Sequence, residues 1–188
     1  MGDPKPTDWF LRIDLEKAMP VAVQTVLSVV DGMGVFGESA RDILKKNGIT
    51  DPQPGTWYKQ QDWLNAFRQI SEQVGKATLF AIGKKIPENA QFPPQINNLE
   101  TALNGIDMAY HMNHRKGEIG HYLVKSYANQ SAVMVCENPY PCDFDRGIIV
   151  AMATRFKPET SLYIRVTHDD SQPCRKKGDD SCTYKIAW

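Results

Sequence analysis

The sequence predicts an α+β fold in which N-terminal helices pack on a small antiparallel sheet with a C-terminal hairpin. Before Gly117, apolar residues recur at three- and four-residue steps, which is the period of an amphipathic helix. After Gly117, short segments rich in β-branched residues alternate between apolar and polar positions, as strands do. The 188 residues, 41% of them hydrophobic, are enough to bury a core without disulfides, so we expect a single ligand-binding domain over residues 1–188.

The first half of the chain is predicted to be helical. Pro20 suits the first turn of a helix whose apolar face reaches Val30. A second helix is expected over about 38–47, closed by Gly48 in a left-handed cap. The remaining elements expected here are a helix over 63–74, a short apolar segment over 78–82, an irregular proline-rich segment over 87–94, and a helix from Leu99 to about His114.

The second half is predicted to supply the sheet. Four segments have the composition of strands, and one apolar segment between them has that of a helix. The strands are expected at 120–128, 132–136, 162–167 and 183–187, and the helix at 144–156.

Charge and hydropathy exclude several classes of partner. Lys plus Arg and Asp plus Glu number 22 each, so no net field attracts nucleic acid or an anionic membrane surface. The longest apolar run, from Val21 to Val30, is shorter than the roughly 20 residues that span a bilayer. The segment from Met1 to Asp8 does not have the pattern of a secretory signal. We therefore expect a cytoplasmic protein that binds neither nucleic acid nor membranes.

The cysteines indicate a metal site. In a reducing compartment four cysteines are rarely two disulfides. Cys174 and Cys182 flank a Gly-Asp turn that would bring both sulfurs together, and two thiolates are half of a tetrahedral zinc site. The adjacent cations at 175–177 would favour the thiolate form. Further ligands are expected from among Cys136, Cys142, His168, Asp169 and Asp170. The competing interpretation is a pair of spectator thiols.

Cys142 lies where the loop 138–141 leads into an apolar helix. At a helix start the dipole favours an anion, so a thiolate at Cys142 would be reactive or metal-binding. The alternative is plain burial at a strand-to-helix junction, since free cysteine is among the most buried residue types.

A polar cluster near the end of the last N-terminal helix is a candidate ligand-binding site. His111 and His114 are three residues apart and share a helix face. Cationic side chains that complement the helix dipole would explain the same composition. The residues assigned to a ligand pocket are Tyr110, His111, His114, Arg115 and His121.

The block from Asn138 to Trp188 resembles the 4-vinyl reductase domain family, in its Pro-Tyr-Pro-Cys-Asp-Phe-Asp-Arg-Gly helix start and its Cys-x7-Cys tail. That family shares the NO-signalling and Golgi-transport ligand-binding fold and commonly binds a small hydrophobic ligand. In phenol-responsive activators a related tail holds zinc. The resemblance implies Cys142, Cys174 and Cys182 as metal ligands, whereas Ser171 stands where those activators have a fourth, glutamate ligand.

The leading functional hypothesis is a ligand-binding or sensor module with a zinc-thiolate site and a small hydrophobic or tetrapyrrole-like ligand, and a homodimer is the expected assembly. No catalytic residue is identified. One alternative is a small enzyme, a hydrolase or tetrapyrrole-pathway protein, that uses Cys142 as nucleophile or His111 and His114 as acid and base. The other is an iron-sulfur or haem protein, with four thiolates from the four cysteines in the iron-sulfur case.

Overall fold

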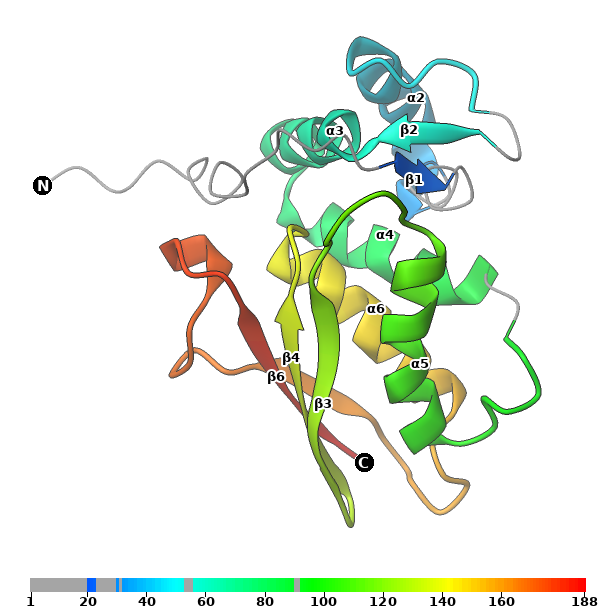
Figure 1. Ribbon diagram of the computed structural model, residues 1–188, viewed down its shortest axis with the longest axis vertical. Coiled ribbons are helices and arrows are strands. Elements are labelled where there is room, and N and C mark those ends of the chain that lie inside the picture. Colours follow the sequence, from blue (N-terminus) through cyan, green and yellow to red (C-terminus); the bar gives the residue numbers. More distant parts are fainter. Residues whose placement is uncertain (1–19, 23–29, 31, 53–55, 90–91) are drawn as a thin grey trace, which may run out of the picture.

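The computed structural model describes residues 20–22, 30, 32–52, 56–89 and 92–188 and has the expected α+β architecture (Figure 1). The helices of the first half are followed by a four-stranded antiparallel sheet that contains the C-terminal strand. The fold class predicted from the change in periodicity is therefore confirmed.

Four α-helices occupy the described part of the first half: α2 (Gly37–Lys46), α3 (Gln60–Gln73), α4 (Lys76–Asn89) and α5 (Leu99–Met112). A 3-10 turn, η2 (Gly34–Phe36), precedes α2. Gly48 has a φ of 82°, so the left-handed position that ends α2 is the one the sequence indicates. At the start of α5 the side chains of Asn98 and Thr101 form a reciprocal capping box.

Two expectations for this half are wrong. Pro20–Ala22 is not the start of a helix: it is strand β1, which pairs antiparallel with β2 (Trp57–Lys59). The rest of that expected helix, except Val30, lies outside the described residues. The segment expected as a short apolar stretch over 78–82 is part of the longer helix α4, which continues through Pro87 to Asn89. Residues 87–89 were expected to be irregular, whereas 92–94 are irregular as expected. Packing against α6 outweighs the local cost of the proline, and Arg155 Nη1 donates to the Pro87 carbonyl at 3.0 Å.

The main sheet has the strand order β3-β4-β6-β5, and all its neighbours are antiparallel. Its strands are β3 (His121–Ala128), β4 (Ser131–Glu137), β5 (Arg165–His168) and β6 (Cys182–Ala187). β5 and β6 form the predicted C-terminal hairpin, joined by a loop that contains a 3-10 turn, η3 (Arg175–Lys177). This hairpin carries His168 and Cys182 at neighbouring ends of its two strands.

Helix α6 (Cys142–Arg155) lies behind the sheet and packs most extensively on α4 (Figure 1). Glycines allow this close packing. A Cβ at Gly83 would lie 2.1 Å from the Phe144 carbonyl oxygen, and one at Gly147 would lie 2.3 Å from that of Phe80. Both distances are shorter than any van der Waals contact, so the two helix backbones approach as closely as they do only because neither residue has a side chain.

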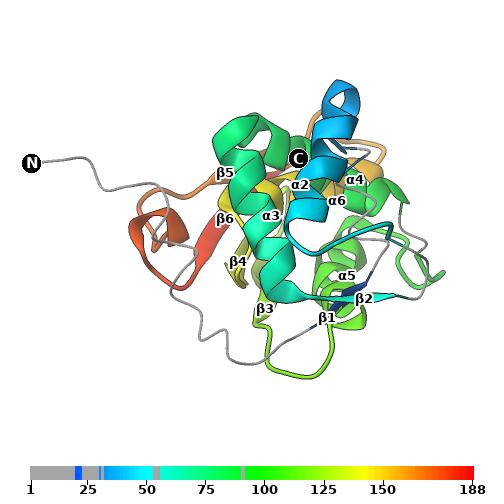
Figure 2. The same ribbon diagram turned by 90° about the horizontal axis from the view of Figure 1, so that it is seen from above.

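The view from above in Figure 2 shows α2 and α3 lying over the end of the molecule at which α6 begins. Phe67 of α3 contacts both Tyr140 and Phe144 through its ring, with centroids 5.7 Å and 4.8 Å away. The start of α6 is thus held between the helical layer and the sheet. None of the helices in the described ranges is long and apolar enough to cross a membrane.

Candidate metal centre and ligand cavity

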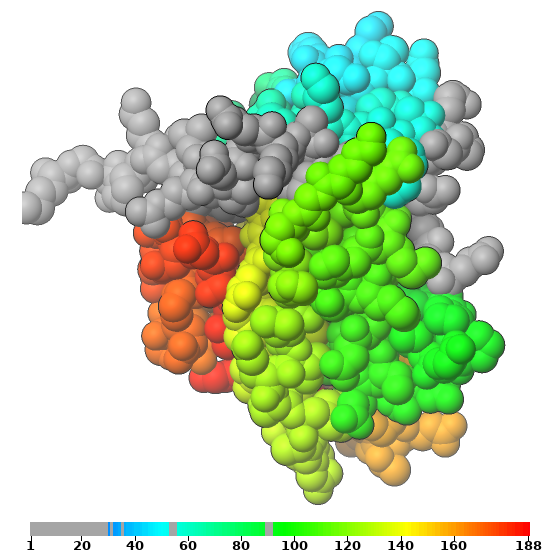
Figure 3. Space-filling model, in the orientation of Figure 1, coloured from blue at the N-terminus to red at the C-terminus, as the bar shows by residue number. Residues whose placement is uncertain are grey.

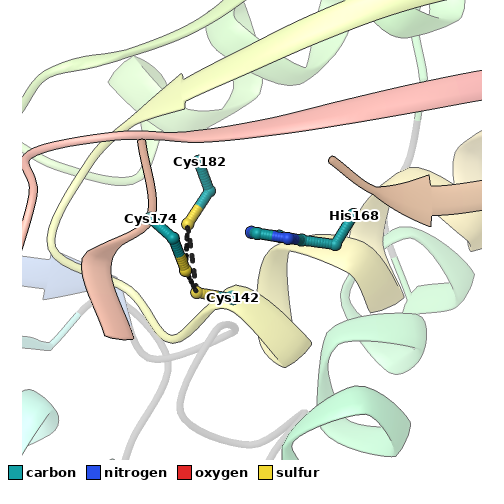
Figure 4. Close-up of side chains that lie close together, drawn as sticks. All are labelled: Cys142, His168, Cys174 and Cys182. Atoms are coloured by element: carbon teal, nitrogen blue, oxygen red, sulfur yellow. Dashed lines mark hydrogen bonds between the residues drawn. The ribbon is translucent and has the colours of Figure 1, made fainter. Parts of the chain in front are cut away.

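Three cysteine sulfurs that are distant in sequence meet at the start of α6. Cys142 is the first residue of the helix, Cys174 precedes η3, and Cys182 begins β6. The Sγ of Cys142 is 3.0 Å from that of Cys182 and 3.8 Å from that of Cys174, and the third distance is 3.9 Å (Figure 4). A disulfide would require about 2.05 Å, so the thiols are free. Tetrahedral zinc, with Zn–S near 2.3 Å, places its sulfurs about 3.8 Å apart.

His168 of β5 completes the group. Its ring points toward the three sulfurs in Figure 4, and one ligand atom from each of the four residues lies within 4.8 Å of the others. His168 Nδ1 is 2.8 Å from Asp170 Oδ1, whereas Nε2 is buried and has no hydrogen-bond partner. A carboxylate that holds one imidazole nitrogen while the other faces a metal is the usual outer-shell arrangement of histidine ligands.

The two closest thiols are electrostatically unequal. The pKa of Cys182 is lowered to about 4, first by the hydrogen bond from Cys142 and then, against burial, by the charge and backbone N–H of Arg175. The pKa of Cys142 is raised, because its thiol donates to Cys182 and is buried. Cys182 is therefore the first thiolate of the group. The raised pKa of Cys142 disfavours the thiolate form that a nucleophile needs.

A buried ion pair holds the tail against α6. The guanidinium of Arg175 bonds to the carboxylate of Asp145, and both side chains are at most 5% exposed. Arg175 also donates to Asn138, and Tyr122 Oη donates to Asp145 Oδ1 at 2.6 Å. The backbone N–H of Arg175 points at Cys182 Sγ, 3.5 Å away. This network fixes the turn on which Cys174 lies.

The other candidate ligands do not join the group. Asp170 contacts His168, and Asp169 accepts from Lys185 Nζ at 2.7 Å and from Ser171. Cys136 is buried on β4 and opposite Cys182 in the sheet register, but it does not belong to the group of four ligand atoms. The set of four thiolates that the iron-sulfur alternative requires is therefore not assembled.

A second feature is a cavity of about 70 Å³ between α4, α5, α6 and β3. Apolar side chains form most of its wall, and tyrosines and one histidine form a polar end. Its lining includes Ile86, Phe92, Ile106, Tyr110, His114, Tyr122, Tyr140, Phe144, Ile148 and Met152.

The polar end is organised around His114. Its Nδ1 is 2.7 Å from the Tyr110 carbonyl oxygen, which can only accept, so Nδ1 carries the proton. Nε2 therefore accepts from Tyr140 Oη at 2.6 Å. Burial lowers the pKa of His114 to about 4, so the ring is neutral at physiological pH.

The predicted pocket residues are only partly brought together. Tyr110 and His114 line the cavity. His111 and His121 instead lie beside Asp107 at the surface. Arg115 lies over the Trp57 ring, 3.9 Å from its centroid. Helical spacing placed His111 and His114 on one face, but a step of three residues turns the two side chains far enough apart for one to enter the core.

Tyr122, Tyr140 and Asp145 were not among the predicted site residues, although the structure places all three at the two sites. Tyr140 and Asp145 lie in the Pro-Tyr-Pro-Cys-Asp-Phe-Asp-Arg-Gly segment that the family resemblance rested on. Tyr122 had no comparable signal, because tyrosine is common in ordinary cores.

A scan against family models and a search of curated proteins give no match. Among solved structures, an S. oneidensis H-NOX protein in the Fe(II)NO ligation state is similar, with a TM-score of 0.62 and 14% identity over 87% of this chain and 97% of that one. An oxygen-binding H-NOX domain related to soluble guanylate cyclases has a TM-score of 0.59 and 17% identity, covering 87% and 90%. A structure that concerns the modulation of haem redox potential by protein-induced porphyrin distortion has a TM-score of 0.61 and 19% identity. The match covers 88% of this chain and 96% of that one.

These matches correct the resemblance to the 4-vinyl reductase domain family, because the similar solved structures are H-NOX proteins and domains. The motifs behind that resemblance are short and specify a helix start and a thiol pair, which do not define a whole fold. The expectation of an NO-signalling type of fold agrees in part. At 13–19% identity the likeness concerns architecture, and this chain has the fold of H-NOX domains.

Proposed function

We propose that this protein is a small-molecule-binding sensor domain in which one metal ion, held by Cys142, His168, Cys174 and Cys182, fixes the C-terminal segment to α6. The observation that carries the proposal is the unpartnered, buried Nε2 of His168 facing three buried thiols. A buried polar atom without a partner costs free energy unless a ligand satisfies it.

Zinc is the ion that this donor set fits best. Three thiolates and one imidazole in a closed group of four match the structural zinc sites of proteins. The four residues come from α6, β5, the loop before η3, and β6, so the ion would join elements that otherwise meet at one edge of the sheet. Such a closed site leaves no position for substrate, which supports a structural role.

The cavity supports the binding of a compact ligand with an apolar body and one polar group. Ile106, Ile148 and Met152 offer apolar contact, and the His114–Tyr140 pair offers a hydrogen-bonding end. The cavity of about 70 Å³ is roughly half the 150 Å³ that accepts benzene in an engineered protein.

The expected homodimer and the expected lack of affinity for nucleic acid stay predictions.

Haem is the second candidate, because similar structures bear titles concerning haem. The residues of this cavity do not fit a haem as they are arranged. Both nitrogens of His114 are engaged, and among the described residues no other histidine or cysteine lines the cavity. Its volume of about 70 Å³ is also below the ~300 Å³ at which cofactor pockets begin.

One preparation tests both candidates. We expect native mass spectrometry of the full chain, purified without added metal, to show about one zinc ion per chain, and the absorption spectrum to show no haem band. A metal-free, folded chain would refute the clamp. An absorption band that corresponds to one haem per chain would contradict the proposal of a small-molecule cavity and support haem binding.

The cavity is tested with 1-butanol and 1-chlorobutane, which are similar in size but differ in the hydroxyl group. NMR of the methyl groups of Ile148 and Met152 should show tighter binding of the alcohol. Ala109→Phe, which fills the cavity, should abolish the chemical-shift changes that the alcohol causes. Met108→Phe, at an exposed neighbouring position, should retain them. Equal shifts in both variants would contradict binding in this cavity.

A further inference from the structure

A second group of metal-binding side chains lies where α5 meets β3, outside both the thiol group and the cavity lining. Asp107 and His111 come from α5, and His121 begins β3. One ligand atom from each lies within 4.8 Å of the other two. The Asp107 carboxylate oxygens are 3.5 Å from His111 Nδ1 and 3.4 Å from His121 Nδ1. Figure 3 shows α5 and β3 side by side on one face of the molecule.

The backbone holds these side chains in place without an ion. Asp107 Oδ1 accepts the Tyr122 N–H at 2.8 Å, which ties the carboxylate to β3. His111 Nδ1 is 2.8 Å from the Asp107 carbonyl oxygen, so Nδ1 carries the proton and Nε2 keeps its lone pair. The two imidazole rings are 5.0 Å apart and 32° from parallel. Two histidines and a carboxylate are thus already grouped.

We propose that Asp107, His111 and His121 bind a divalent transition-metal ion such as Zn²⁺, Co²⁺ or Ni²⁺. Imidazole nitrogen is a preferred ligand of these ions. Asp107 Oδ1 and His121 Nδ1 are 3.4 Å apart, which is the donor separation around a tetrahedral ion with bonds near 2.1 Å. His111 would join them through Nε2 by a turn of its ring. The histidine side chains are 40% and 43% exposed and have room for it.

Glu118 supports the site from outside. Its Oε1 is 3.7 Å from His121 Nε2, and its side chain is 81% exposed, so it would accept from Nε2–H when Nδ1 binds the ion. The remaining positions would be filled by water, as in sites that keep part of the coordination sphere open. An ion here would join α5 to β3 next to the bond that Tyr110 Oη donates to the Ile119 carbonyl, at 2.7 Å. The expected consequence is a more stable α5–β3 junction.

Cobalt distinguishes this site from the thiol group. Co²⁺ bound by thiolates gives a strong charge-transfer absorption, whereas Co²⁺ bound by imidazole and carboxylate does not. Calorimetric titration of the full chain, as purified, with Co²⁺ should show binding of an ion. The absorption spectrum of that complex should lack a charge-transfer band, and the imidazole NMR signals of His111 and His121 should broaden.

Variants assign the ligands. His121→Asn and His111→Asn should weaken this binding at least about tenfold, the loss that even an outer-shell change causes. Asp107→Asn keeps an acceptor for the Tyr122 N–H and should weaken it similarly, while Asp42→Asn, an exposed change on α2, should not. Unchanged binding in His121→Asn, or no such binding in the wild type, would overturn the proposal. Failure of the thiolate centre alone would leave it standing.

Discussion

Serine in place of Cys174 is expected to remove the bound metal and to lower the melting temperature. A hydroxyl is a weak zinc ligand, and the three remaining donors no longer close the site. A ligand that binds only the folded chain, present at a thousand times its dissociation constant, stabilises it by about 4 kcal/mol. At ~2–4 °C per kcal/mol for a chain of this size, the loss is readily measured by calorimetry together with elemental analysis.

Cys136→Ala is the matched control. Cys136 is as buried as the metal-binding cysteines but lies outside their group, so this variant should retain its metal even if the core is weakened. If Cys174→Ser kept a full equivalent of metal, or if Cys136→Ala lost it, the assignment of the ligands would be wrong.

Asp145→Asn is expected to destabilise the protein by about 3–5 kcal/mol, because it leaves the charge of Arg175 buried without a counter-ion. The side chain of Asp145 is fully buried and that of Arg175 is 5% exposed. Asparagine has nearly the same shape and still accepts from Tyr122, so the variant isolates the charge. Metal affinity should fall as well, since Arg175 directs its backbone N–H at Cys182. Urea unfolding and metal competition measure the two effects.

Asp143→Asn provides the comparison, two residues earlier on the same helix. Asp143 pairs with Lys176 at 2.8 Å, and the two side chains are 22% and 38% exposed. A surface pair of this kind contributes about 0–1 kcal/mol. Equal losses of stability in the two variants would show that the burial of the Asp145 pair is not what matters.

The elements that were predicted well are those with strong local signals. Gly48 ends α2 as expected, and α5 and β4 lie within a few residues of their predicted bounds. The failures at Pro20 and Pro87 share a cause. In both, contacts with residues distant in sequence decide the local conformation: β1 pairs with β2, and α4 packs on α6 through Gly83 and Gly147.

Most of the candidate metal ligands were proposed from the paired thiols of the tail together with the family resemblance. Cys142, Cys174 and Cys182 were proposed together, and His168 stood among four options for the remaining position. The choice among those options depends on side-chain direction. β5 directs His168 toward the sulfurs, while Asp169 is held by Lys185 and Asp170 contacts His168. No local pattern encodes those directions.

The sequence by itself determined the change from helices to sheet, the thiol chemistry of the tail and the balanced charge, because periodicity, composition and residue type are local properties. Only the tertiary structure decided which donors meet, that His114 faces a cavity while His111 and His121 face Asp107, and that Arg175 is neutralised by Asp145. The physical reason is that each of these depends on packing between segments that are brought together only when the whole domain folds.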